Sequence, residues 1–130
     1  MPITEPLAAE SLEPLPSAAP QVSVVVTIYD EAQNVPDLCA RLRTELDAMA
    51  RPCEVVLVDD GSSDGSRGLL RTEHERDPRF RVVLLKRNFG QHPAMAAGIA
   101  AARGGIIVTM DGDLQNDPAD IPKLVDALER

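Results

Sequence analysis

Four short apolar runs mark the chain, and a segment with helical spacing of its apolar residues follows each run. The runs are rich in valine, isoleucine and leucine, which is typical of strands buried on both faces of a parallel sheet. They cover residues 22–28, 53–58, 81–85 and 106–110. The pattern therefore predicts four strands.

The segments after these runs carry the signals of helices. Asn34 can cap a first helix with Pro36 in its first turn, and the apolar stripe of that helix is Leu38, Leu42, Leu46 and Met49. An alanine-rich helix follows the third run, and Gly98 within it would permit close packing on the sheet. Asp117 is expected to cap the last helix, with Pro118 at its first position.

This alternation predicts an α/β fold with a mainly parallel sheet and helices on both faces, because right-handed crossovers join parallel strands. The architecture is Rossmann-like, and the sequence leaves the strand order open. Residues 1–20 are rich in proline, alanine and glutamate and have no periodicity, so we expect a disordered tail. Residues 21–130 then form one domain.

Polar clusters follow the carboxyl end of every predicted strand. In open α/β sheets, ligands bind in the crevice outside these ends, so the clusters predict one shared site. In chain order, its candidate residues are Tyr29, Glu31, Asp59, Asp60, Arg87, Asn88, Asp111 and Asp113.

This rim is rich in carboxylates, which repel each other unless a cation or hydrogen-bond donors offset their charge. Asp111 and Asp113 are separated by one residue at the end of a predicted strand. Their oxygen atoms are hard ligands that suit Mg²⁺ or Mn²⁺ rather than zinc. A divalent ion held there can bridge carboxylate and diphosphate, so the residues predict a nucleotide-diphosphate site.

Composition narrows the candidate partners and the compartment. The net charge of −8 argues against nucleic acid, whose phosphates are bound by basic surfaces. No apolar run approaches the roughly 20 residues that span a bilayer, and the acidic start is unlike a signal peptide. Cys39 and Cys53 match no metal-ligand spacing and are expected to be buried thiols. These features predict a cytoplasmic protein.

Three segments resemble, in order and spacing, the motifs of family 2 glycosyltransferases with a GT-A type fold. They are VSVVVTIYDEAQN, VLVDDGSSDGS and VTMDGDLQNDP, and the resemblance covers about residues 21–130. The segments LKRNFGQHPAMAAGIAAARG and MDGDLQNDPADIPKLV are similar to the polyprenyl-phosphate branch of that family. This branch includes dolichyl-phosphate mannosyltransferases and undecaprenyl-phosphate glucosyl- and aminoarabinosyl-transferases. The RNFGQH and DLQN parts look most similar to the aminoarabinosyl-transferases.

The resemblance implies a role for each candidate residue. Asp59 and Asp60 match the acidic pair that holds the nucleoside, and Tyr29 and Glu31 match residues that flank the base. Arg87 and Asn88 lie on a loop beside the donor. The remaining positions match the metal and diphosphate ligands, with catalytic importance for the two aspartates: Asp111, Asp113 and Gln115.

The chain departs from the family pattern at three positions: Thr27 stands where the family usually has proline, Asp30 where it has asparagine, and Gly112 where alanine is common. Asp30 adds negative charge near the expected nucleoside. The family's catalytic domain is also longer, so we expect its acceptor-binding half to follow the last helix.

The implied function is metal-dependent, inverting transfer of a sugar from a UDP- or GDP-sugar to a polyprenyl phosphate at the inner face of the membrane. Two alternative functions stay open: a nucleotide-sugar-binding fragment without turnover, and a family 2 transferase with a polysaccharide or other non-lipid acceptor. The sequence also leaves open whether the chain forms a homo-oligomer. An aspartate-dependent phosphatase would need Ser or Thr soon after the acidic pair, where Leu114 and Gln115 stand instead.

Overall fold

The structure, a computed structural model, describes residues 8–12, 19–113 and 115–129. Its strands are β1 (Ala8–Leu12), β2 (Val22–Ile28), β3 (Cys53–Asp59), β4 (Phe80–Leu85) and β5 (Ile106–Asp111). Its helices are α1 (Val35–Ala48), α2 (Ser66–Arg76), α3 (Gln91–Ala101), the 3₁₀ turn η1 (Pro118–Asp120) and α4 (Ile121–Glu129). The four strands predicted from the apolar runs are β2 to β5.

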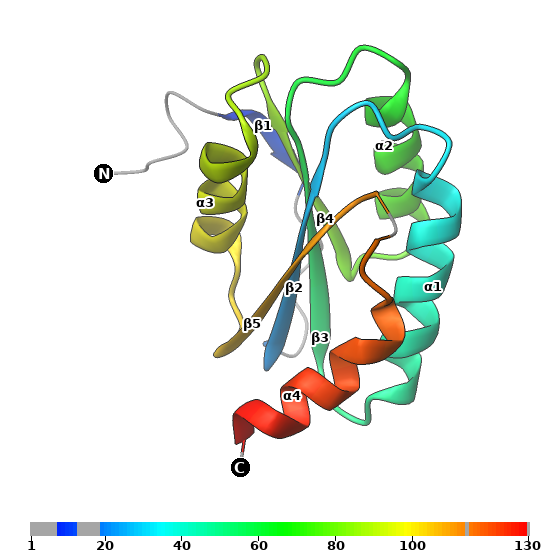
Figure 1. Cartoon of the computed structure of the whole chain (residues 1–130), viewed down its shortest axis with the longest axis vertical. Helices are drawn as coiled ribbons and strands as arrows, with labels where there is room; N and C mark the ends of the chain where they lie inside the picture. Colours follow the sequence, from blue (N-terminus) through cyan, green and yellow to red (C-terminus); the bar gives the residue numbers. More distant parts are fainter. Residues whose placement is uncertain (1–7, 13–18, 114, 130) are drawn as a thin grey trace.

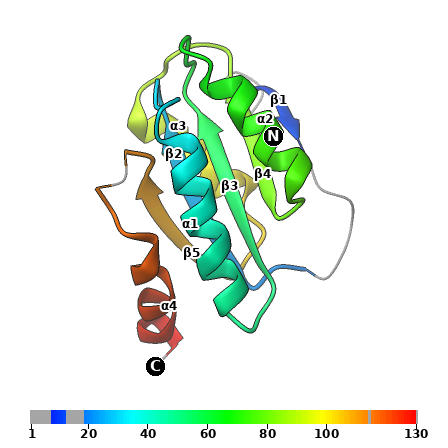
Figure 2. The ribbon, with the colours of Figure 1, turned by 90° about the vertical axis from the view of Figure 1, so that its right-hand side faces the viewer.

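The strands form one sheet in the order β1-β4-β3-β2-β5, with β2 to β5 parallel. Helix α3 lies on one face, and α1, α2 and α4 lie on the other (Figures 1 and 2). The predicted parallel sheet with helices on both faces is confirmed. No helix in the described ranges is long and apolar enough to cross a membrane.

The alternating side chains of the strands build a separate core on each face. Val24 and Val26 of β2 pack in the larger core with α1, α2 and α4, whereas Val25 packs in the smaller core with α3. At Gly98 of α3, a Cβ atom would lie 2.4 Å from Val25 Cγ1 and 2.7 Å from Val58 Cγ2. The prediction that Gly98 permits close packing of helix on sheet is therefore confirmed.

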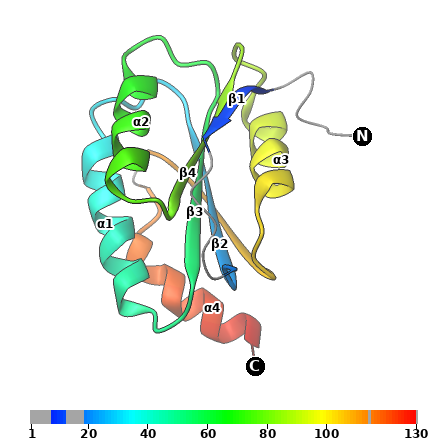
Figure 3. The same ribbon diagram turned by 180° about the vertical axis from the view of Figure 1, so that it is seen from behind.

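The N-terminal segment corrects one expectation. Ala8–Leu12 forms β1, which pairs antiparallel with the outer edge of β4, for example Leu12 with Val82 (Figure 3). The disordered tail expected over residues 1–20 is wrong for this segment. Pairing along an exposed strand edge depends on backbone groups, so a segment without apolar periodicity can join a sheet. Residues 1–7 and 13–18 lie outside the described part.

The helix starts agree with the sequence in position and differ in detail. Asn34 precedes α1, but its side chain makes no capping hydrogen bond; its Nδ2 donates instead to Oε1 of Glu31 at 2.8 Å. Asp117 does cap, because its Oδ1 accepts the Ala119 N–H at 2.9 Å. The cap begins the short η1 turn, and α4 follows it directly.

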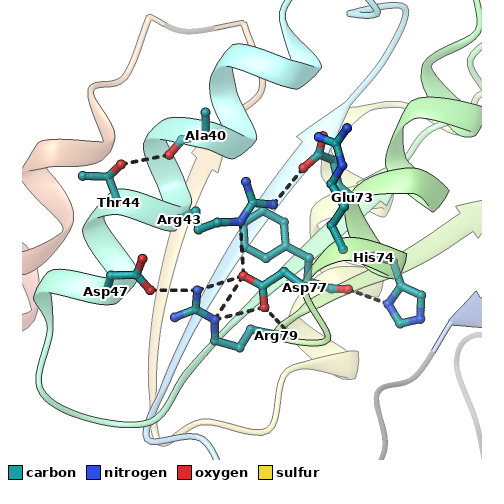
Figure 4. Close-up of polar contacts among 10 residues, drawn as sticks. Ala40, Arg43, Thr44, Asp47, Glu73, His74, Asp77 and Arg79 are labelled. Atoms are coloured by element: carbon teal, nitrogen blue, oxygen red, sulfur yellow. Dashed lines mark hydrogen bonds and ion pairs between the residues drawn. The ribbon is translucent and has the colours of Figure 1, made fainter.

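A charged network joins α1 to the end of α2 (Figure 4). The guanidinium of Arg43 lies 5.0 Å from the Phe80 ring centroid and donates to Glu73 Oε1 at 2.8 Å and to Asp77 Oδ2 at 3.3 Å. Beside it, Nδ1 of His74 lies 2.7 Å from the Phe80 carbonyl oxygen. The network links α1 to the end of α2 on the same face of the sheet.

Both cysteines are buried and free, as predicted. Burial raises the pKa of Cys39 to about 12, and the nearby negative charge of Glu73 acts in the same direction. Burial also raises the pKa of Cys53. Because the thiolate is the reactive form, neither side chain is suited to catalysis.

A buried carboxylate, which the apolar pattern did not reveal, lies in the middle of the sheet on the α3 side. Glu54 of β3 is only 2 % exposed. Ser23 Oγ donates to its Oε2 at 2.6 Å, Arg81 Nη1 donates to its Oε1 at 2.9 Å, and the Arg103 N–H donates to its Oε2 at 2.7 Å. This network ties β2, β3, β4 and the end of α3 together.

Candidate functional site

The loops after the parallel strands meet at one edge of the sheet. Thr27 of β2 pairs with Asp111 of β5. Two backbone hydrogen bonds continue the register beyond the strands: the Asp60 N–H donates to the Ile28 carbonyl at 2.8 Å, and the Gly112 N–H to the Thr27 carbonyl at 2.9 Å. The two acidic motifs therefore lie on either side of the end of β2.

A cleft of about 370 Å³ opens between these loops. The candidate residues that line it are Tyr29, Glu31, Asp60, Asn88, Asp111 and Asp113. The structure adds Gly90 and Gln91 to this lining, which the sequence analysis did not select. Three candidates lie outside the lining: Asp59, Arg87 and Gln115.

Asp60 holds the loop between β4 and α3 against the cleft. Its Oδ1 accepts the Phe89 N–H at 2.8 Å, and its Oδ2 accepts the Gly90 N–H at 3.1 Å. The Asn88 Nδ2 lies 3.3 Å from the same Oδ2. All of these donors are uncharged, so Asp60 fixes the position of the loop without a cationic partner among them.

Asp59, predicted to share the nucleoside with Asp60, is fully buried beneath the cleft. Its Oδ2 accepts the Ser62 N–H at 2.9 Å and lies 3.9 Å from Arg67 Nε. Its Oδ1 has no hydrogen-bond partner in the described part of the chain. The structure therefore separates the acidic pair: Asp60 faces the cleft, and Asp59 supports the turn that follows β3.

The turn after β2 presents Tyr29 and Glu31 to the cleft. Asp30 between them has a positive φ of 49°, a conformation that aspartate and asparagine adopt more readily than most residues. Its N–H donates to Ser62 Oγ at 2.8 Å, and its Oδ1 accepts the Ser63 N–H at 2.9 Å. The Asp30 carboxylate thus holds the turn between Tyr29 and Glu31 and is not itself part of the cleft lining.

Asp111 and Asp113 lie together in the cleft at the end of β5. Gln91 Nε2 donates to Oδ1 of Asp111. Asp113 Oδ1 accepts the backbone N–H of Gln115 at 3.1 Å. The Gln115 residue is exposed and lies outside the cleft lining, so the structure brings together two of the three predicted metal ligands.

The charge of the cleft fits a divalent cation. Within the described ranges, no lysine or arginine forms a salt bridge with the carboxylates that line it, which are Glu31, Asp60, Asp111 and Asp113. The same ranges contain no cluster of three or more histidine, cysteine, aspartate or glutamate side chains that would hold a metal alone. Two hard carboxylates at an open edge suit Mg²⁺ or Mn²⁺, which are commonly bound by one or two carboxylates together with substrate phosphates.

Arg87 is not among the residues that line the cleft. Its guanidinium stacks on the Phe89 ring, with 4.0 Å to the centroid. His92 is exposed and lines a neighbouring hollow that shares Gln91 and Asp111 with the cleft. Neither side chain lies in the main cleft.

The sequence model of the family described as "Glycosyl transferase family 2" matches residues 23–130. The chain belongs to this family. The resemblance inferred from the three motifs is thereby confirmed, and the solved glycosyltransferase structures described below confirm the GT-A type of fold.

Relatives of this family-2 chain come from the polyprenyl-phosphate branch. It is 43 % identical over 111 residues to an undecaprenyl-phosphate 4-deoxy-4-formamido-L-arabinose transferase of Salmonella choleraesuis (strain SC-B67), covering 83 % of the chain and 34 % of the relative. It is 46 % identical over 111 residues to the transferase of the same name from Edwardsiella ictaluri (strain 93-146), covering 84 % and 34 %. The chain thus spans about a third of these curated relatives.

Solved structures of glycosyltransferases share the fold of this family-2 chain. A mannosyltransferase from Pyrobaculum calidifontis, in complex with GDP-Man and Mn²⁺, is 29 % identical with a TM-score of 0.59, covering 78 % of this chain and 30 % of that one. Glucosyl-3-phosphoglycerate synthase from Mycobacterium tuberculosis, solved with Mn²⁺ and UDP, is 22 % identical with a TM-score of 0.64, covering 85 % and 40 %. The second likeness concerns the fold alone.

Proposed function

We propose that this chain forms the nucleotide-sugar-binding part of an inverting, metal-dependent transferase that moves a sugar to undecaprenyl phosphate. The observation that carries the proposal is the cleft at the carboxyl ends of β2, β3 and β5, where carboxylates without cationic partners among the described residues converge. Membership of family 2 and relatives named as undecaprenyl-phosphate transferases support the reaction class and the acceptor. By this proposal, the whole protein acts at the cytoplasmic face of the membrane.

The cleft is divided into a nucleoside side and a diphosphate side. On the first, the exposed ring of Tyr29 offers a surface for stacking on a base, with Glu31 and Asp60 nearby to accept hydrogen bonds from a UDP or GDP nucleoside. On the second, Asp111 and Asp113 would hold Mg²⁺ or Mn²⁺. When bound, the ion would neutralise charge on the leaving diphosphate.

The chain's residues act in this proposal by binding and orientation. An acceptor phosphate with a second pKa near 6 is largely ionised at neutral pH, so it can attack without a protein base. Asp111 and Asp113 then contribute to catalysis by fixing the diphosphate, and the Asp60-anchored loop keeps the donor aligned. The cleft thus supports donor binding directly, and binding is the step to test.

Nucleoside diphosphate affinity is expected to rise roughly tenfold when Mn²⁺ is added, because the cation removes the repulsion between phosphates and carboxylates. The doubly substituted chain Asp111→Asn/Asp113→Asn should lose this gain. In EDTA, the same variant should bind at least as tightly as the unmodified chain. Isothermal titration calorimetry with UDP and GDP, with Mn²⁺ or EDTA, measures all of these affinities.

Nucleoside monophosphates provide the matched control. UMP and GMP have the same base and ribose but no diphosphate, so Mn²⁺ should change their affinity much less. Equal UDP and GDP affinities with and without divalent ions, in a chain shown to be folded by circular dichroism, would remove the basis for a metal-dependent donor site.

A further inference from the structure

Gln91 is the first residue of α3 and reaches across the cleft to β5. Its Nε2 donates to Oδ1 of Asp111, and its side chain forms part of the cleft wall. It is the one side-chain donor to this carboxylate among the residues that the structure describes. A carboxylate oxygen has two lone pairs, so this bond leaves acceptor capacity on Oδ1 and the whole of Oδ2 for a cation.

Asp111 is also held through its backbone. Its N–H donates to Oδ1 of Asn116 at 3.3 Å, and its position in β5 is fixed by pairing with Thr27. The backbone is therefore anchored from one direction and the carboxylate from another. With the backbone fixed, the Asp111 carboxylate can still rotate about its side-chain bonds. The hydrogen bond from Gln91 restricts this rotation.

The position of Gln91 depends on the loop before it. Gly90, with a φ of +104°, turns the chain into α3, and its N–H donates to Asp60 Oδ2 at 3.1 Å. The preceding Phe89 N–H donates to Asp60 Oδ1 at 2.8 Å. A continuous path of contacts thus runs from Asp60 on the nucleoside side, through Gly90 and Gln91, to Asp111 on the diphosphate side.

We propose that Gln91 is a positioning residue that orients the Asp111 carboxylate for the divalent cation, and that Asp60 positions Gln91 through the loop. The inference rests on the function proposed above. Partners that hydrogen-bond to metal ligands fix their orientation, and their loss typically lowers metal affinity by roughly 10–100-fold. Asp60 then serves the metal side of the cleft as well as the nucleoside side.

Gln91→Met tests the first half of the proposal, since methionine has a similar length and helix propensity but no N–H donor. The measured quantity is the Mn²⁺ concentration that gives half of the gain in UDP or GDP affinity. We expect this concentration to rise roughly tenfold, while the thermal midpoint, which reports the stability of the fold, stays unchanged. Gln33→Met, at an exposed turn residue outside the cleft lining, is the matched control and should leave the concentration as it was.

Asp60→Asn tests the second half, because an amide nitrogen cannot accept the Gly90 N–H. Asp60→Asn should also raise the half-maximal Mn²⁺ concentration. In the double variant Asp60→Asn/Gln91→Met, this concentration should increase by a smaller factor than the product of the factors measured for the two single variants. If the two factors multiply in the double variant, Asp60 does not act through Gln91, and the path through the loop is overturned. A half-maximal concentration unaltered by Gln91→Met would overturn the role of Gln91.

The two proposals fail differently. If the unmodified chain shows no gain with Mn²⁺, the metal site itself is wrong, and with it the role of Gln91. If that gain is present and is lost in Asp111→Asn/Asp113→Asn but kept in Gln91→Met, the donor site stands and the positioning role is rejected.

Discussion

Glu54→Ala is expected to cost about 3–5 kcal/mol of unfolding free energy, the usual range for breaking a buried ion pair by removing one partner. The Arg81 side chain is 4 % exposed and would lose its ion pair with Glu54 inside the protein. Ser23 Oγ and the Arg103 N–H would lose their acceptor as well. Because a domain is stable by only about 5–15 kcal/mol, urea unfolding should show a large fall in the midpoint.

Glu54→Gln keeps the shape and removes the charge, so it should fold with a smaller loss. Glu75→Gln, at an exposed position of α2, is the matched control and should change the unfolding free energy by less than about 0.5 kcal/mol. A Glu54→Ala chain as stable as the control would show that the network contributes no net stability.

We expect the contribution of the Glu54 carboxylate to the unfolding free energy to decrease as the pH falls. Burial alone would raise the pKa of Glu54, but the hydrogen bonds from Ser23, the Arg103 N–H and Arg81 outweigh it and hold the pKa below its ordinary value. Its contribution is therefore present above the unfolded pKa of about 4.3 and is lost as the pH falls through the folded pKa. The stability difference between the unmodified chain and Glu54→Gln should shrink as the pH falls from 6 toward 3.

The Glu54 network is also a part of the fold that could not be predicted from the sequence. Strands β2 to β5 were predictable because buried apolar runs identify themselves, and Gly98 because its alanine-rich helix implied tight packing. A glutamate at the start of the run CEVVLV gives no local sign that Ser23, Arg81 and Arg103 will converge on it. Strand β1 was missed because pairing at a sheet edge is carried by backbone groups.

The candidate site, like the fold, could be predicted only in part from the sequence. The carboxyl ends of parallel strands meet, so the position of Asp60, Asp111 and Asp113 on one rim followed from the strand assignment. The geometry of the turn after β3 decides whether Asp59 or Asp60 faces the cleft, and two neighbouring aspartates in the sequence give no sign of that geometry. Gln91 was missed because its contact with Asp111 exists only through the packing of α3 beside β5.

Gly61→Ala is expected to cost about 2–5 kcal/mol, as the sum of backbone strain and overpacking. Gly61 has a φ of +78°, and a Cβ atom there would lie 2.3 Å from the Arg87 carbonyl carbon and 2.5 Å from the Asn88 nitrogen. These are backbone atoms, so the clash can be relieved only if the whole loop moves. That loop carries Asn88, Gly90 and Gln91, which line the cleft. We therefore expect a loss of UDP or GDP affinity in addition to the loss of stability.

Gly65→Ala separates strain from the close approach of the two loops. Gly65 has a φ of +96°, but a Cβ atom there would meet nothing within 4 Å. This variant should lose only about 1–2 kcal/mol, because the left-handed backbone is its sole cost, and its nucleotide affinity should not change. Urea unfolding and calorimetry on both variants give the comparison. If Gly61→Ala matched Gly65→Ala in both measurements, the contact between the Gly61 turn and the Arg87–Asn88 backbone would not be what shapes the cleft.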